Sequence, residues 1–302
     1  MHMVKKLFGA SFEESKLISV NLFSNNRPFY YDLGLSDSNK LYQRLLLIIP
    51  ALCLEILMYA ISIGMAELIN ENNNMSGSAK LFVYGIQYFI FLKPLIVISI
   101  FLMGIIISVN IFPKRNFMIQ RVFGILIQLL LIIQFCFSMM PSLLGLTLGA
   151  TGWFGFSIIC IYGLIFFVKT LVSRTRKIKS EMYGELTASP LNIIMDKLWN
   201  FLKKIWIFSL AIVVLNILTL RIGMWGSFSF LSFICMFAGP IYFGLLTLFI
   251  GGPLKMYVNS FYLVKYAEQY RVLWKVTDEQ WHGKRRAKKL AKKKLKQERK
   301  GK

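Results

Sequence analysis

Glu55 is the residue whose chemistry stands out, because it is the only acidic residue deep inside a long apolar run. Tyr59 and Ser62 follow it at helical spacing and extend it into a polar stripe. A carboxylate in hydrocarbon is costly unless it is paired, protonated or open to water, so an embedded acid points to function. We interpret the stripe as a candidate transport path. The alternative is that Glu55 is a neutral, hydrogen-bonded packing residue.

Two further sets of polar residues accompany this stripe. Lys93 is a candidate partner of Glu55, but the favoured interpretation is that it begins a helix and extends its ammonium to the outer headgroups. Gln128 and Gln134 share one face of the third apolar run with three smaller or polar residues, Gln120, Gly124 and Ser138. Such a face lines a polar path or hydrogen-bonds to neighbouring helices, and we favour the second interpretation.

Helix breaks are expected at Pro94 and at Gly239-Pro240. The second of these would free backbone carbonyls at the middle of a membrane, as in transporters with broken helices, although a static kink is the commoner outcome.

Enzyme motifs are missing from the sequence. His2 and His282 lie outside the apolar runs, so they cannot build a metal site or a general base within a bilayer. There is no nucleophile-elbow, zinc-protease or phosphate-loop motif. The four cysteines all fall in apolar segments, which argues against a disulfide framework. We therefore expect no enzyme, no metal and no cofactor.

The C-terminal tail, Lys284 to Lys302, holds twelve Lys or Arg among nineteen residues. A capping sequence precedes it, so a helix is expected. Each basic residue near an anionic leaflet contributes at most about 1 kcal/mol, which favours lipids of the inner leaflet as partners. Nucleic acid is not expected, apart from a contact with the ribosome. The candidate lipid- or partner-binding residues are Lys284, Arg285, Arg286, Lys288, Lys289, Lys292, Lys293 and Lys294.

The elements that position these residues follow from the apolar runs. The chain is 56% hydrophobic with a net charge of +22, and its runs exceed the length of a buried core helix. The sequence predicts an all-α, multi-pass membrane bundle with both termini in the cytoplasm, because 33 of the 36 basic residues then fall inside. The six predicted spans are residues 41–68, 94–112, 117–140, 146–168, 205–220 and 228–250.

Three regions flank or connect these spans. Residues 1–40 form a cytoplasmic segment with an amphipathic helix, and residues 189–204 an elbow helix on the inner surface that precedes the fifth span. Residues 254–302 form a cytoplasmic helix with aromatic and basic side chains that continues into the tail. Pro141 begins an external turn within the bundle 41–253. Whether residues 81–92 are transmembrane, re-entrant or interfacial is left open.

Two functions fit this pattern. The first is a non-catalytic transport component, either a permease subunit or a channel-like bundle, that works with another protein subunit in the plasma membrane. The second is a membrane scaffold, a secretion-accessory protein or an immunity protein whose basic tail docks a partner or the ribosome. The abundance of Ile, Leu, Lys and Asn suggests a bacterial origin.

Overall fold

The computed structural model describes residues 6–20, 85–89, 91, 93–111, 117–184, 190–220, 230–282 and 284–300, and the single positions 49, 53, 56, 57 and 60. Within these residues the chain is helical and contains no strand, which confirms the prediction of an all-α fold. Three described segments are long and apolar enough to cross a membrane: Leu129–Tyr183, Pro190–Leu218 and Phe233–Lys265.

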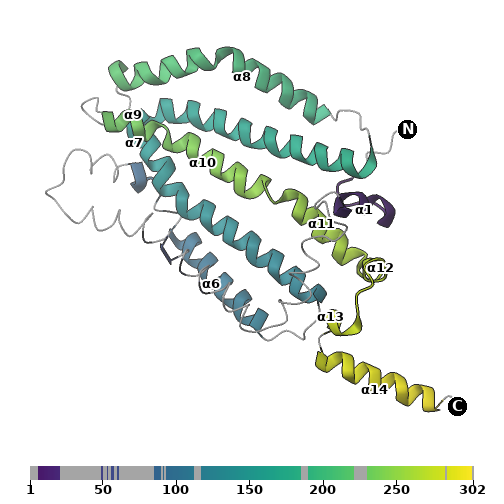
Figure 1. Ribbon diagram of the computed structural model, residues 1–302. Coiled ribbons are helices and arrows are strands. Elements are labelled where there is room, and N and C mark those ends of the chain that lie inside the picture. Colours follow the sequence, from purple (N-terminus) through teal and green to yellow (C-terminus); the bar gives the residue numbers. More distant parts are fainter. Residues whose placement is uncertain are drawn as a thin grey trace.

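The longest helix, α7 (Phe117–Tyr183), is a hairpin of two arms (Figure 1). Residues 117–151 and 153–183 meet at Gly152, whose φ of 65° and ψ of 176° leave the helical region. That combination is essentially restricted to glycine. The prediction of a turn at Pro141, between spans 117–140 and 146–168, is wrong, because the helix continues through this residue. A proline removes one backbone donor and bends a helix, whereas the conformation of Gly152 reverses its direction.

The next helix, α8 (Pro190–Leu215), lies along the second arm of α7. It unites the predicted elbow helix 189–204 and most of the predicted span 205–220 in one continuous helix, so the predicted bend between them is absent. No glycine or proline lies between residues 191 and 215, which leaves no residue there to break the helix. A π-helical turn, η4 (Asn216–Leu220), ends this segment.

A chain of short helices then passes between the two arms of α7 (Figure 1). It consists of α9 (Phe230–Met236), α10 (Ala238–Leu246), the π-helical turn η5 (Thr247–Gly251) and α11 (Leu254–Lys265). Contacts of Gly239 show the insertion directly, because an added Cβ there would lie 3.0 Å from Thr147 on one arm and 3.0 Å from Ile159 on the other. Glycine therefore allows α10 to fit between the arms.

The closed end of the hairpin also receives a short helical segment at residues 85–87. A Cβ on Gly85 would lie 1.7 Å from the carbonyl oxygen of Gly145 and 3.0 Å from the amide nitrogen of Gly149. The two backbones therefore touch, which the small residues at Gly85, Gly145 and Gly149 allow. The helix α6 (Lys93–Ile111) follows and packs along α7.

At the open end of the hairpin the N-terminal segment meets the C-terminal helices (Figure 1). The helix α1 (Phe12–Val20) begins with a capping box, in which the Ser11 amide and the Glu14 amide each bond the other residue's side chain at 2.7 and 3.3 Å. Ala10 and Ile18 are buried in one cluster with the end of α7 and with α11. Part of the apolar side of the N-terminal segment therefore packs within the protein, whereas Phe8 and Leu17 are about half exposed.

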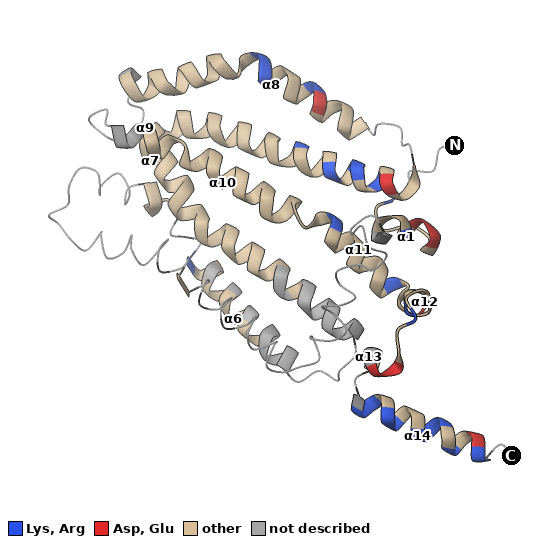
Figure 2. Cartoon of the chain, viewed as in Figure 1, with Lys and Arg blue, Asp and Glu red and all other residues tan. Residues whose placement is uncertain are grey.

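We call this end the platform: residues 6–18, residues 178–183 of α7, α11, and α12 (Ala267–Leu273). Beyond it lie α13 (Asp278–His282) and the basic α14 (Lys284–Lys300). Figure 2 shows Lys and Arg on the adjoining parts of α7 and α8 and on α11, α12 and α14, and Asp and Glu on α13. The charged residues of the described chain thus gather towards the open end of the hairpin.

Candidate functional site

The predicted path centred on Glu55 lies outside the described residues, as do Tyr59 and Ser62. Its proposed partner Lys93 is the first residue of α6 and is partly exposed. Pro94 follows it in the first turn, where a missing backbone donor costs little. Gly239 and Pro240 likewise lie in the first turn of α10, directly after the boundary with α9 at Phe237.

Of the two glutamines, Gln128 lies in the first arm of α7 and Gln134 is buried there. The Gln134 amide donates a hydrogen bond of 3.4 Å to Ser138 Oγ, one helical turn away. Its Oε1 accepts none from the described residues. A buried polar atom without a partner costs about 1–3 kcal/mol, so this oxygen has capacity for a donor that these helices do not supply.

Near the closed end of the hairpin, polar side chains tie the helices together. The Asn216 amide donates to the Thr151 carbonyl, which joins η4 to the first arm of α7. Thr147 Oγ1 donates to Leu143 O at 3.0 Å and lies 3.3 Å from Cys235 O of α9. These groups therefore serve as contacts between helices, a common role of polar residues in membrane bundles.

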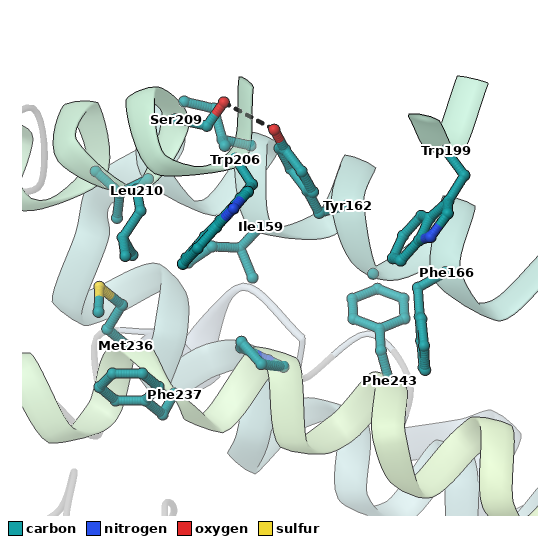
Figure 3. A pocket seen from close by; sticks show the side chains of 14 residues that line it. Ile159, Tyr162, Phe166, Trp199, Trp206, Ser209, Leu210, Met236, Phe237 and Phe243 are labelled. Carbon is teal, nitrogen blue, oxygen red and sulfur yellow. Dashed lines mark hydrogen bonds between the residues drawn. The ribbon is translucent and has the colours of Figure 1, made fainter. Parts of the chain in front are cut away.

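An aromatic pocket of about 380 Å³ lies between the second arm of α7, α8 and the α9–α10 boundary. Figure 3 shows Trp206 and Leu210 of α8 facing Met236 and Phe237 across it. The Tyr162 hydroxyl, 2.9 Å from Ser209 Oγ and 3.3 Å from Leu202 O, supplies a polar group at its wall. The volume falls within the range of about 300–1,000 Å³ for ligand pockets.

This pocket is not among the predictions from sequence. Tyr162 and Phe166 are one turn apart on α7, while Trp199 and Trp206 are two turns apart on α8. Each pair lies on one face of its helix, which is the signal that the sequence offers. It does not identify the partner helix, so the pocket emerges only when the hairpin is folded.

The platform is held together by tyrosines of the C-terminal helices. The buried Tyr262 hydroxyl donates to Leu7 O at 2.7 Å and accepts from the Ala10 amide at 3.0 Å. The Tyr266 hydroxyl donates to Ala10 O at 2.7 Å, and Tyr270 lies 2.9 Å from Ser15 Oγ. Residues 262–270 are therefore joined to the N-terminal segment by hydrogen bonds to its backbone and to the Ser15 hydroxyl.

The basic tail forms the expected helix, α14, with its cationic side chains mostly exposed. Ala287 is buried, and Lys294 Nζ lies 3.8 Å from Asp278 of α13. Beside this junction, burial and the positive charges of Arg271 and Arg286 lower the pKa of His282 below its ordinary 6.5, while two carboxylates, Asp278 and Glu268, oppose the shift. The tail is thus attached to the platform through α13.

The described residues form neither a metal-binding cluster nor a disulfide. Among the described residues no cluster of His, Cys, Asp and Glu has the size to hold a metal ion. All four cysteines have free thiols. The chain matches no known protein family, no curated protein and no solved structure.

Proposed function

We propose that this chain is a six-span protein of a bacterial plasma membrane, with both termini in the cytoplasm. The platform supports this arrangement, because it brings residues 6–18 and the helices after residue 254 to one end of the bundle. The basic residues gather at the same end, and basic residues favour the cytoplasmic side.

Accessibility to an impermeant maleimide tests this topology. Cysteine introduced at Leu17 or Gln297, in a variant without the native cysteines, should react in inverted vesicles and be protected in spheroplasts. Cysteine at Asn73, in the predicted external loop, should show the opposite pattern. Reaction of Leu17→Cys or Gln297→Cys in intact spheroplasts would overturn the proposal.

We further propose that the protein acts as a membrane scaffold whose platform docks a protein partner. The observation that carries this proposal is a set of exposed apolar side chains on the platform, which also bears charged residues. Phe8 is 50% exposed and Val272 is 77% exposed, and the Phe8 ring lies 4.8 Å from that of Phe261, which is itself 40% exposed. Exposed apolar groups with a charged surround are typical of protein interaction sites.

A photoreactive side chain placed at Val272 tests this docking surface. It should form one discrete protein adduct in cells, and the adduct should disappear when Phe8 is changed to Ser. The matched control is the same photoreactive residue at Leu295, which is 56% exposed on the tail and should give no such adduct. Adducts of equal yield at both positions, or none at Val272, would refute the scaffold function.

Transport remains the second candidate, and Gln134 is the observation that favours it. Its unpartnered Oε1 lies in a buried part of the same bundle for which the sequence predicts the Glu55 stripe. If the stripe lines a path, cysteine at Ser62 should react with a water-soluble reagent, whereas cysteine at the apolar Ile56 should not. Protection of Ser62→Cys from the reagent, together with unchanged transport activity in Glu55→Gln, would exclude this candidate.

A further inference from the structure

The second arm of α7 and α8 form a continuous antiparallel seam. Contacts mark its successive levels: Tyr162 with Ser209, Phe166 with Trp199 at 5.8 Å between ring centroids, and Lys169 with Asp196 at 3.5 Å. These contacts lie about one helical turn apart on α7 and run in the opposite order on α8, at residues 209, 199 and 196, so the residues of α7 that face the seam follow one line. The aromatic pocket is the part of this line nearer the closed end of the hairpin.

One turn beyond the pocket the seam becomes polar and basic. A small cleft of about 40 Å³ is lined there by Lys169, Ser173 and Arg176 of α7 and by Asn192 and Asp196 of α8, with Val172 and Met195 between them. Two cations face one carboxylate, which leaves the cleft with a net positive charge. It lies on the side of the open end, where the other basic residues gather.

Lys169 connects the apolar and the polar parts. Its Nζ lies 5.1 Å from the centroid of the Trp199 ring, which lines the aromatic pocket, and also pairs with Asp196 in the basic cleft. The ammonium is therefore fixed at the boundary between the two. An apolar cavity that ends at a fixed cation matches a molecule with a hydrocarbon chain and an anionic head.

We propose that this seam binds an anionic phospholipid of the inner leaflet. One acyl chain occupies the aromatic pocket, and the phosphate lies at Lys169 and Arg176. Trp206 is 51% exposed and Phe237 is 44% exposed at the rim, so the pocket opens sideways, as entry of a chain from a bilayer requires. Basic pockets between membrane helices on the cytoplasmic side recognise such headgroups. The Asp196 carboxylate opposes the phosphate and limits the site to weakly charged headgroups.

Native mass spectrometry of the full chain in mild detergent tests the acyl part of the site. Phosphatidylglycerol should be retained in preference to phosphatidylcholine of the same chains. Leu210→Trp fills the pocket at a position that is 42% exposed and should abolish retention. Phe208→Trp, two residues away, 71% exposed and outside the lining, should leave it unchanged.

The head part is tested by charge removal. Lys169→Gln with Arg176→Gln should lower the affinity for phosphatidylglycerol by about a hundredfold, or tenfold for each contact of about 1.4 kcal/mol. The matched double variant Lys177→Gln with Lys197→Gln removes two neighbouring exposed cations that do not line the cleft and should change the affinity less than twofold.

A second measurement covers the case in which Leu210→Trp fails to fold. Phosphatidylglycerol with brominated chains should quench the fluorescence of the wild-type protein more than brominated phosphatidylcholine at equal mole fraction. This preference should vanish in the double variant Trp199→Phe with Trp206→Phe, because both rings line the pocket. Equal quenching by both lipids, equal retention of both, or lipid binding left intact in a folded Leu210→Trp would each overturn the proposal.

Discussion

Removing the Tyr262 hydroxyl is expected to release the N-terminal segment from the platform. In the folded protein this hydroxyl donates to Leu7 O at 2.7 Å and accepts from the Ala10 amide at 3.0 Å, and the side chain is fully buried. Tyr262→Phe keeps the ring and its packing but leaves both backbone groups without this partner. The change therefore isolates the contribution of the two hydrogen bonds.

The magnitude follows from these two groups. A buried donor or acceptor left unsatisfied costs about 1–3 kcal/mol. Because the bond to Leu7 O is only partly buried and so contributes about 1 kcal/mol, the pair should weaken the attachment of residues 6–18 by about 2–4 kcal/mol. At 1.4 kcal/mol for each factor of ten, local opening of this segment becomes about 30-fold to several hundredfold more frequent. The helices of the bundle do not depend on these bonds and should keep their stability.

Hydrogen exchange measured by mass spectrometry reads this opening directly. Peptides that cover residues 6–18 should exchange faster by that factor in Tyr262→Phe, and peptides from α7 and α8 should not change. Tyr257→Phe is the control, because its buried hydroxyl on the same helix makes no hydrogen bond within the described residues. Unchanged exchange in Tyr262→Phe, or equal acceleration in both variants, would show that these two hydrogen bonds do not hold residues 6–18 on the platform.

Three further predictions concern the hairpin and the tail. Gly152→Ala should cost about 1–3 kcal/mol of folding stability and lower the Tm by about 2–4 °C per kcal/mol. Gly244→Ala, where the added Cβ meets open space, should leave the Tm unchanged. An unchanged Tm in Gly152→Ala would contradict the hairpin. Gly145→Ala should cost a similar amount of folding stability, because the added Cβ would lie 2.8 Å from the backbone of Ile86. Gly104→Ala, where the added Cβ meets open space, is the control, and equal stability of the two variants would contradict the contact. The pKa of His282, followed by NMR, should lie below 6.5. Because the unfolded chain then binds a proton more readily than the folded one, docking of α13 should weaken as the pH falls below 6.5; a pKa above 6.5 would reverse the sign.

The composition of the chain predicts that it forms apolar helices able to cross a membrane. The positions of its proline and glycine residues do not predict where the chain turns. Pro141 is the more visible signal in the sequence, yet the helix passes through it and reverses at Gly152. Four glycines lie at positions 145, 149, 152 and 155, and composition does not distinguish them. Gly145 requires glycine because the backbone of residues 85–86 lies against it, and Gly152 requires glycine because its φ is positive. Both requirements arise only in the folded hairpin.

The aromatic stripe of the C-terminal helix shows the same limit. Spacing predicts that Tyr262, Tyr266, Tyr270 and Trp274 share one face of a single helix. The structure divides this helix at Tyr266, between α11 and α12, but the three tyrosine hydroxyls all meet the N-terminal segment. Spacing does not say what the face binds, because tyrosines serve equally at a membrane interface and in a protein contact. Their hydroxyls decide the matter, since each bonds a group of the N-terminal segment more than 250 residues earlier in the chain. No local pattern contains that partner.

The same contact bears on the number of spans. Residues 6–18 are fixed at the open end of the hairpin, whereas residues 85–89 pack at its closed end, where the Tyr88 ring lies 5.0 Å from that of Trp153. Two segments at opposite ends of a membrane bundle are separated by an odd number of crossings. The predicted span 41–68 supplies one such crossing, and α6, the two arms of α7, α8 and the α9–α11 segment would supply five more. The six crossings that we propose would return the chain to the end at which it began, and Tyr262 holds the N-terminal segment at that end.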